Sequence, residues 1–224
     1  MTKYAIIVAG GKGSRFGSDI PKQFLPLNNM PVLMHTINRF AKCNASIIVV
    51  LPEAQIEDWK SLCKENNFTT PHSIVSGGST RFHSVKNALC TINAEKGDLI
   101  AVHDGVRPLV TDEIINEAYD TATIHLSAVP AIDVTDTIRQ LENEDGTSKA
   151  LLRSSLRAVQ TPQTFEATLL INAYNAPFTD AFTDDASVVE AAGHSITLTH
   201  GSPRNIKITH SIDLLIAEEL LKNE

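Results

Sequence analysis

Short runs of apolar residues alternate along the chain with longer stretches in which apolar positions recur every three or four residues. The short runs are nearly continuous in hydrophobicity and rich in β-branched residues, which is typical of strands buried on both faces of a parallel sheet. These strands are predicted at residues 4–9, 46–51, 72–75, 98–103 and 126–132. The longer stretches have the period of amphipathic helices and are predicted at 31–43, 80–92 and 111–122.

The alternation of strands and helices predicts an α/β fold. Right-handed crossovers then place helices on both sides of an open, mostly parallel sheet. Further elements are expected as helices at 166–174, 184–192 and 211–221 and a strand at 195–199. Thr111 and the pair Asp184-Asp185 stand where helix caps belong. There is no internal repeat, so we expect a single domain over residues 1–224.

One region interrupts this pattern. Asp145-Gly146 lies between extended segments at 136–139 and 151–160, and Asp-Gly in that setting is a hairpin signal. Residues 141–149 are too polar to join the core, so the hairpin should project from the α/β body as an arm. From the pattern alone two interpretations stay open: an arm that dimerises or covers a site, and a solvated loop.

Charge and hydropathy exclude some classes of protein. The 224 residues include 19 Lys and Arg against 26 Asp and Glu, a net charge of −7, which argues against a module that binds DNA or RNA. Small anions are not excluded, because a few cations in one cleft can dominate the local potential. The apolar runs are too short to cross a bilayer or to form a signal peptide. We therefore expect a cytoplasmic protein with neither a membrane nor a nucleic acid as partner.

Metal-binding and nucleophilic motifs are not apparent. The three cysteines, Cys43, Cys63 and Cys90, are an odd number without close pairs, which suggests reduced thiols. No C-x-x-C or H-E-x-x-H occurs, so a structural zinc is not expected. The eight histidines show no pairing with a serine or cysteine that would suggest a nucleophile.

A glycine-rich loop, A-G-G-K-G-S-R-F-G, follows the first predicted strand. Glycines let backbone N–H groups approach phosphate oxygens, and ligands bind at the carboxyl ends of strands in open α/β sheets. A dinucleotide fingerprint fails because Phe16 stands at its third glycine, and a P-loop fails because no Gly-Lys-Ser/Thr follows. A tight turn without a ligand is the alternative. Against it, Arg15 and Lys22 lie in the same loop and could reach one polyphosphate.

The string A-G-G-x-G-x-R, followed by P-K-Q-F, resembles the nucleotidyltransferases that activate sugar and polyol phosphates, and among them the cytidylyltransferases. Further motifs of that family follow in order: G-G with Arg81 and Ser84, H-D-G-V-R-P at 103–108, D-T at 136–137, Arg153 with T-P-Q at 161–163, T-D-D-A-S at 183–187 and N-I-K at 205–207. Such an ordered set is far more specific than one glycine string. The segments at 153–161 and 201–207 are closer to the 2-C-methyl-D-erythritol 4-phosphate enzymes than to the ribitol 5-phosphate enzymes, which remain the first alternative.

The resemblance implies a Rossmann-like nucleotidyltransferase fold in which residues 134–160 form an arm that dimerises and carries substrate contacts. It implies a homodimer that transfers CMP from CTP to a polyol phosphate and releases pyrophosphate. Such chemistry needs no protein nucleophile, because neutralising and positioning anionic reactants supplies most of the catalysis. Mg²⁺ is expected, held mainly by phosphate oxygens, with no protein ligand assigned. A nucleotide-sensing protein without catalysis and, more remotely, a dinucleotide oxidoreductase are the alternatives from other classes.

The resemblance also implies roles for particular residues. The catalytic residues would be Arg15, Lys22, Arg153 and Lys207. CTP would contact Ala9, Gly10, Gly11, Gly13, Gly77, Gly78, Ser84, Asp104 and Gly105. The polyol phosphate would contact Asp104, Arg107, Thr137, Arg153, Thr161 and Lys207. Thr137 and Arg153 lie on the arm and would serve the neighbouring subunit. Without the resemblance, Arg153 reads as a solvated charge, Lys207 as the partner of a carboxylate and Asp104 as a turn cap.

Overall fold

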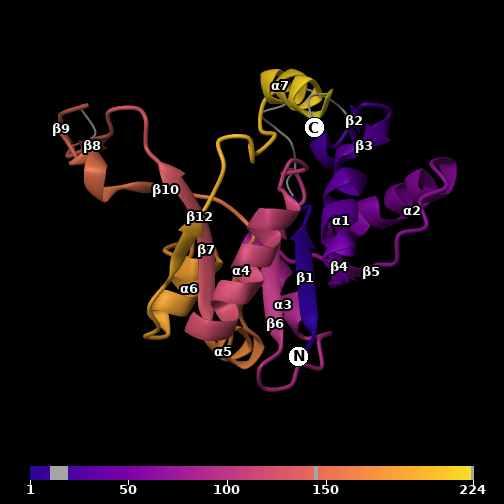
Figure 1. The fold of residues 1–224 in the computed structure, drawn as a ribbon, viewed down its shortest axis with the longest axis horizontal. Helices are drawn as coiled ribbons and strands as arrows, with labels where there is room; N and C mark the ends of the chain where they lie inside the picture. The colour runs from indigo at the N-terminus through magenta and orange to yellow at the C-terminus, as the bar shows by residue number, and fades with distance from the viewer. Residues whose placement is uncertain (11–19, 144–145, 223–224) are drawn as a thin grey trace.

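The computed structural model describes residues 1–10, 20–143 and 146–222 of the chain. Its main sheet has eight strands in the order β10-β7-β11-β6-β1-β4-β5, with β12 paired to β7 (Figure 1). The strands are β1 (Lys3–Val8), β4 (Ser46–Leu51), β5 (Ser73–Ser76), β6 (Leu99–Asp104), β7 (Ser127–Asp133), β10 (Arg157–Val159), β11 (Gln163–Glu166) and β12 (Leu198–His200). The expected strands are all present, each within a few residues of its predicted bounds.

The sheet is parallel over its central part and mixed towards one edge. β1 pairs in parallel with β4 and β6, and β4 pairs in parallel with β5. β11 lies antiparallel between β6 and β7, and β10 runs antiparallel to β7. The antiparallel strand β11 was not predicted, because three of its four residues are polar although all are buried. Hydrophobic periodicity cannot detect a strand whose polar groups are satisfied by tertiary hydrogen bonds.

Helices cover both faces of the sheet, as expected. The bounds are α1 (Val32–Lys42), α2 (Ile56–Glu65), α3 (Arg81–Leu89), α4 (Asp112–His125), α5 (Ala167–Ala173), α6 (Asp185–Ala191) and α7 (Ser211–Lys222). One core joins α1, α2 and α4 to one face, and the other joins α3, α5 and α6 to the opposite face. Neighbours in β1 alternate accordingly: Ile7 enters the first core and Ile6 the second. No helix in the described ranges has both the length and the apolar character that a membrane crossing requires.

The helix ends follow their side-chain chemistry. Thr111 accepts a hydrogen bond from the Ile114 amide and begins α4 as predicted. Asp184 is the N-cap of α6 and forms a reciprocal capping box with Ser187. The prediction that Asp185 also caps this helix is wrong, because its side chain turns into the core and binds residues of other helices. Helix α2 was missed, since Trp59 is its only fully buried side chain.

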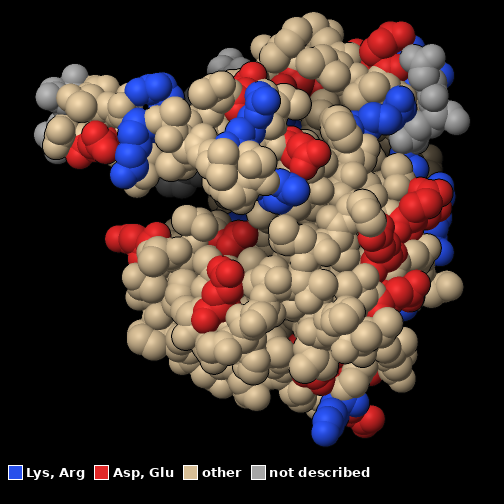
Figure 2. Space-filling view, turned by 60° about the vertical axis from the view of Figure 1, so that its left-hand side comes forward, with Lys and Arg blue, Asp and Glu red and all other residues tan. Residues whose placement is uncertain are grey.

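The predicted hairpin is present and projects from the body of the molecule (Figure 1). Its strands are β8 (Arg139–Leu141) and β9 (Ser148–Ala150), paired antiparallel. The predicted extended segments were misplaced: the strands lie nearer the turn, and a short 3₁₀ helix, η3 (Arg153–Ser155), interrupts the return. Figure 2 shows the arm standing clear of the body, with both basic and acidic side chains along it.

Candidate active site

A cavity of about 420 Å³ opens at the carboxyl ends of β1 and β6, next to the turn after β5. The residues around it come from five segments of the chain. They are Val8, Ala9 and Gly10 at the end of β1, Lys22 and Gln23 in the 3₁₀ helix η1 (Lys22–Phe24), Gly78, Ser79, Thr80, Arg81 and Ser84 around the start of α3, Asp104 and Val106 at the end of β6, and Lys207. The fold thus brings many of the predicted site residues together. Gly11, Gly13 and Arg15 lie outside the described residues.

The turn before α3 leaves no room for side chains at Gly77 and Gly78. A Cβ on Gly78 would lie 2.4 Å from the Cβ of His83, and one on Gly77 would lie 3.1 Å from the Ser84 hydroxyl. The Gly78 amide donates to the Ser84 Oγ over 3.0 Å, and that hydroxyl donates to the Thr80 carbonyl. Ser84 therefore shapes the cavity wall by fixing this turn. Gly77 supports the same turn without lining the cavity.

The ends of β1 and β6 meet closely. In the parallel register Val8 lies opposite Asp104, and the Gly105 amide donates to the Val8 carbonyl over 2.9 Å. A Cβ on Gly105 would come within 3.0 Å of the Cβ of Ala9 and 3.1 Å of Leu33. Glycine at this position lets the strand ends approach one another. Gly105 acts there through backbone packing and is not on the cavity wall.

Asp104 is a buried carboxylate that binds two cations. Its Oδ2 accepts from Arg107 Nε over 3.2 Å and from Lys207 Nζ over 3.0 Å. Burial alone would raise the Asp104 pKa, but Lys207, Arg81 and Arg107 outweigh it and hold that pKa well below its ordinary value. Asp104 therefore stays ionised and fixes Lys207, whose side chain remains 45% exposed beside the cavity. The alternative that Lys207 pairs with a carboxylate is confirmed, and it is compatible with a ligand contact.

The segment that carries Lys207 is irregular. Asn205 is fully buried, and its carbonyl accepts from Arg107 Nη1 over 2.7 Å. The Ile208 amide donates to the Val106 carbonyl, and the Ile208 side chain packs in a core with Ala217 of α7. The backbone on both sides of Lys207 is thus anchored, and the ion pair with Asp104 holds its ammonium group.

Arg107 and Thr161 lie behind Asp104 and are not on the cavity wall. Thr161 Oγ1 accepts from the Asp104 amide over 3.1 Å and lies 3.0 Å from His103 Nδ1. His103 Nε2 lies 3.2 Å from the Arg107 carbonyl, which can only accept. The imidazole proton is therefore on Nε2, and the Thr161 hydroxyl donates to Nδ1. These groups fix the position of Asp104, and their predicted contacts with a polyol phosphate stay predictions.

His103 should make the protein less stable in mild acid. Burial lowers its pKa to about 4 from the ordinary 6.5, so the folded protein favours the neutral ring. As the pH falls below 6.5, the unfolded chain takes up a proton that the folded chain refuses. The free energy of unfolding should fall by about 2 to 3 kcal/mol from this group between pH 7 and 4.5. Urea titrations at both pH values, on the native chain and on His103→Asn, measure the difference.

His194→Asn is the matched control, because His194 is exposed and should leave the pH dependence unchanged. The Asp104 carboxylate does not interfere, since its lowered pKa affects stability only below its ordinary value of 3.8. An equal loss of stability in the native chain and in His103→Asn would contradict this assignment.

Gln23 is a site residue that sequence reasoning missed. Its side chain is 1% exposed, and Nε2 donates over 2.8 Å both to the Ala9 carbonyl and to Gln55 Oε1. It thereby ties the start of the glycine loop to the turn that carries Lys22. The ring of Phe24 stacks on Trp59 and holds the other end of that turn. The signal in the sequence was the glutamine of the P-K-Q motif. The motif alone did not indicate which groups this glutamine contacts.

Arg81 was also left off the predicted site, although its motif was noted. Arg81 lines the cavity, and its Nη2 donates over 2.6 Å to Asp185 Oδ2. The signal was an arginine shortly after a glycine pair. Its partner is far away in the sequence and emerges only from the fold.

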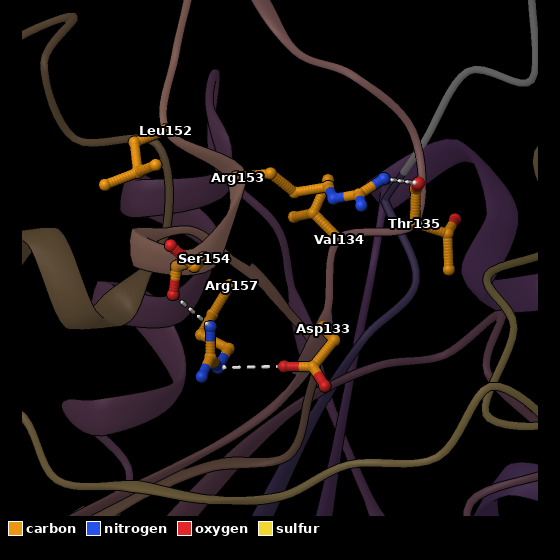
Figure 3. A pocket seen from close by; sticks show the side chains of 7 residues that line it. All are labelled: Asp133, Val134, Thr135, Leu152, Arg153, Ser154 and Arg157. Atoms are coloured by element: carbon orange, nitrogen blue, oxygen red, sulfur yellow. Dashed lines mark hydrogen bonds and ion pairs between the residues drawn. The ribbon is translucent and has the colours of Figure 1, made fainter.

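A second hollow, of about 780 Å³, lies at the base of the arm (Figure 3). Arg153 Nη1 donates over 2.5 Å to the Thr135 carbonyl, and Arg157 Nε binds Asp133 over 3.2 Å. Arg153 and Thr137 are both exposed, and neither lines the first cavity within this chain. Within one chain the structure therefore does not bring these two predicted residues to the other site residues.

The cavity offers a limited donor set for a metal ion. In the described part of the chain, no three His, Cys, Asp or Glu side chains gather as metal ligands. Asp104 supplies the carboxylate among the described residues of the cavity wall. Mg²⁺ commonly binds through one or two carboxylates and substrate phosphates, keeping several waters. The residues present fit an ion of that kind, held mainly by its substrate.

Comparison with known proteins decides the family. The model of the IspD family, 2-C-methyl-D-erythritol 4-phosphate cytidylyltransferase, matches residues 3–223. The chain belongs to this family. The 2-C-methyl-D-erythritol 4-phosphate cytidylyltransferase of Bacteroides thetaiotaomicron is 51% identical over 223 residues, covering 99% of this chain and 100% of that protein. The enzyme of the same name from Porphyromonas gingivalis is 46% identical over 220 residues, covering 98% and 97%.

Solved structures of the cytidylyltransferase family agree with the fold. The Francisella tularensis 2-C-methyl-D-erythritol 4-phosphate cytidylyltransferase superposes with a TM-score of 0.81 at 30% identity, covering 98% of this chain and 99% of that one. The Thermus thermophilus protein of the same name gives 0.76 at 28% identity, covering 99% and 100%. The expected family and its Rossmann-like, mostly parallel fold are thus confirmed, and the chain is a nucleotidyltransferase.

Proposed function

We propose that this chain transfers CMP from CTP to 2-C-methyl-D-erythritol 4-phosphate, giving 4-diphosphocytidyl-2-C-methyl-D-erythritol and pyrophosphate in non-mevalonate isoprenoid precursor synthesis. The observation that carries the proposal is the cavity at the strand ends, where Lys22, Arg81 and Lys207 meet a glycine turn in a member of this family. Membership supplies the substrate class, and the cavity supplies cations and backbone donors for a triphosphate.

In the reaction a phosphate oxygen of the polyol phosphate forms a bond to the α-phosphorus of CTP, and the bond to pyrophosphate breaks. Negative charge grows on the α-phosphate oxygens and on the leaving group, so fixed positive charge lowers the barrier. We assign that task to Lys22 and Lys207, together with Arg15 and the amides of Gly11 and Gly13. Lys207, held by Asp104, bridges the attacking phosphate and the α-phosphate.

The base end of CTP is assigned to the turn before α3. Side chains are excluded at Gly78 by its contact with His83, so the backbone of this turn faces the ligand. Ala9 and Gly10 lie on the same cavity wall and would cover the nucleoside. Such a wall recognises a base by backbone and hydroxyl donors and acceptors.

We propose that the chain is one domain over residues 1–224, whose arm at 134–160 pairs two copies into a homodimer and reaches the partner's cavity. The exposure of Arg153 and Thr137 and their absence from the wall of the chain's own cavity support this arrangement. Leu141 and Leu152 on the arm are 70% and 73% exposed, and a subunit contact would cover such side chains. Arg153 and Thr137 would then hold the polyol phosphate in the neighbouring site.

Mg²⁺ belongs to the proposal as an ion that would be held mainly by phosphate oxygens, with Asp104 as the protein carboxylate on the cavity wall. Its charge would neutralise the triphosphate and make the phosphorus easier to attack. We also place the protein in the cytoplasm. Its cysteines are free thiols in the structure, which suits a reducing compartment.

A paired substrate assay tests the proposed function. Purified protein is incubated with CTP, Mg²⁺ and either 2-C-methyl-D-erythritol 4-phosphate or ribitol 5-phosphate, and pyrophosphate release is measured. We expect faster turnover of the methylerythritol substrate. Faster turnover of ribitol phosphate would overturn the substrate assignment, and CTP binding without pyrophosphate release would identify a nucleotide-sensing protein.

A further inference from the structure

We propose that Asp185 and Tyr174 are positioning residues that hold Arg81 at the wall of the CTP cavity, so that the base meets a donor fixed in place. The inference rests on the proposed function for the identity of the ligand. Neither Asp185 nor Tyr174 lies on the cavity wall, so both act through Arg81.

The three side chains form a continuous chain of hydrogen bonds. Asp185 is completely buried, its Oδ2 accepts from Arg81 Nη2 over 2.6 Å, and its Oδ1 accepts from the Tyr174 hydroxyl over 2.7 Å. Arg81 begins α3, Tyr174 ends α5 and Asp185 begins α6. The Asp185 carboxylate therefore connects α3, α5 and α6. The connection lies at the start of α3, where Arg81 lines the cavity.

The segment that carries the Asp185 carboxylate is itself fixed to the sheet. Gln163 of β11 is 1% exposed, its Nε2 donates to Asp184 Oδ2, and its Oε1 accepts from the Ala186 amide, each over 2.8 Å. These bonds fix the backbone on both sides of Asp185 to the sheet. Because the backbone around it is fixed, the buried Asp185 carboxylate is held in one position. The Arg81 guanidinium that binds it is held in the same way.

Tyr174 is also fixed in place by its packing. Its ring is 2% exposed and stacks on Phe82 with centroids 4.7 Å apart and planes 18° apart. Burial and the neighbouring Asp185 raise the Tyr174 pKa well above its ordinary value, so the hydroxyl remains a donor. Its bond satisfies the carboxylate oxygen that Arg81 does not use.

Arg81 keeps its charge in this setting. Burial alone would lower its pKa, but the Asp185 carboxylate outweighs it and raises that pKa above the ordinary value. The side chain is 29% exposed, and Nη2 already donates a hydrogen bond to Asp185. A guanidinium has further N–H donors and no acceptor, so the part that faces the cavity can only donate.

A guanidinium that can only donate distinguishes pyrimidines where it faces position 3 of the ring. Cytosine offers an acceptor at N3, whereas uracil carries a hydrogen on N3 that would oppose an N–H donor. Unpaired or opposed polar groups in a desolvated site cost affinity. The clamp of Asp185 and Tyr174 should therefore strengthen CTP binding and the preference for CTP over UTP, and leave binding of the polyol phosphate unchanged.

Tyr174→Phe tests the clamp with the least disturbance, because it removes the hydroxyl and keeps the ring on Phe82. We expect KM for CTP to rise about fivefold, with KM for the polyol phosphate changed less than about twofold. Tyr119→Phe is the matched control, since the Tyr119 hydroxyl is equally buried and donates over 2.8 Å to the Tyr4 carbonyl in the other core. Both variants lose one buried hydrogen bond, and only Tyr174→Phe should affect CTP.

Asp185→Asn removes the charge from the centre of the clamp. KM for CTP should rise about tenfold or more, and the CTP-to-UTP ratio of kcat/KM should fall about fivefold. In an Arg81→Ala background the same substitution should add nothing, because its effect passes through Arg81. An undiminished effect of Asp185→Asn without Arg81, or equal losses for both substrates, would overturn the proposal.

Two measurements keep the outcome decisive. If Asp185→Asn fails to fold, Tyr174→Phe carries the test, and an unchanged KM for CTP in that folded variant would overturn the clamp. Direct CTP binding by calorimetry separates the clamp from the reaction. A native chain without turnover would refute the proposed function, while weaker CTP binding by Tyr174→Phe than by Tyr119→Phe would still support the clamp.

Discussion

Replacing Lys22 by alanine should lower kcat by about 100-fold or more, the size of loss typical of a missing transition-state charge contact. Lys22 begins the turn next to the cavity, and its neighbour Gln23 binds the Ala9 carbonyl at the start of the glycine loop. This connection places the ammonium group beside the amides that would receive the triphosphate. Steady-state pyrophosphate release with saturating CTP and polyol phosphate measures the effect.

Lys60→Ala is the control for removing a lysine charge. Lys60 is exposed on α2 and pairs with Glu57, away from the cavity wall, so its loss should leave kcat unchanged. A similar melting temperature for both variants would confirm that folding is intact. A decrease in kcat of only a few-fold for Lys22→Ala would remove Lys22 from the catalytic residues.

Replacing Arg153 by alanine should raise KM for the polyol phosphate by about tenfold or more and leave CTP affinity unchanged, because a guanidinium bonded to phosphate is a strong charge-assisted contact. Arg153 stands on the arm with its Nη1 bonded to the Thr135 carbonyl, which fixes the direction of the side chain (Figure 3). Separate titrations of the two substrates measure the effect. Arg139→Ala, also on the arm but in β8, is the control. An equal loss of CTP affinity would contradict the assignment.

Mixed dimers extend the Arg153 experiment to the question of which subunit it serves. A dimer of one Lys22→Ala subunit and one Arg153→Ala subunit has one complete site if the arm acts across the dimer. We expect such dimers, purified with two affinity tags, to recover activity that neither parent shows. Verified heterodimers without recovery would show that Arg153 serves its own chain.

The sequence predicted best those elements whose buried residues are apolar. β4 was placed at its observed bounds, because Ser46–Leu51 is an apolar run after its first residue. β11 was missed, because Gln163, Thr164 and Glu166 look exposed in the sequence. Their polar groups are satisfied by residues far along the chain, such as the Gly97 amide that donates to Glu166. A pattern of neighbouring residues in the sequence cannot reveal a hydrogen-bond partner that lies far along the chain.

The sequence by itself determined the family, the α/β class, the glycine turns and the projecting hairpin, since ordered motifs, buried strands and turn chemistry are local properties of the chain. Only the tertiary structure decided which charges neutralise one another. It showed that Asp104 holds Lys207, that Arg107 and Thr161 stand behind that carboxylate, and that Asp185 holds Arg81 instead of capping a helix. The physical reason is that a pKa, an ion pair or a fixed donor depends on distance and burial. Both arise only when segments remote in sequence are packed together.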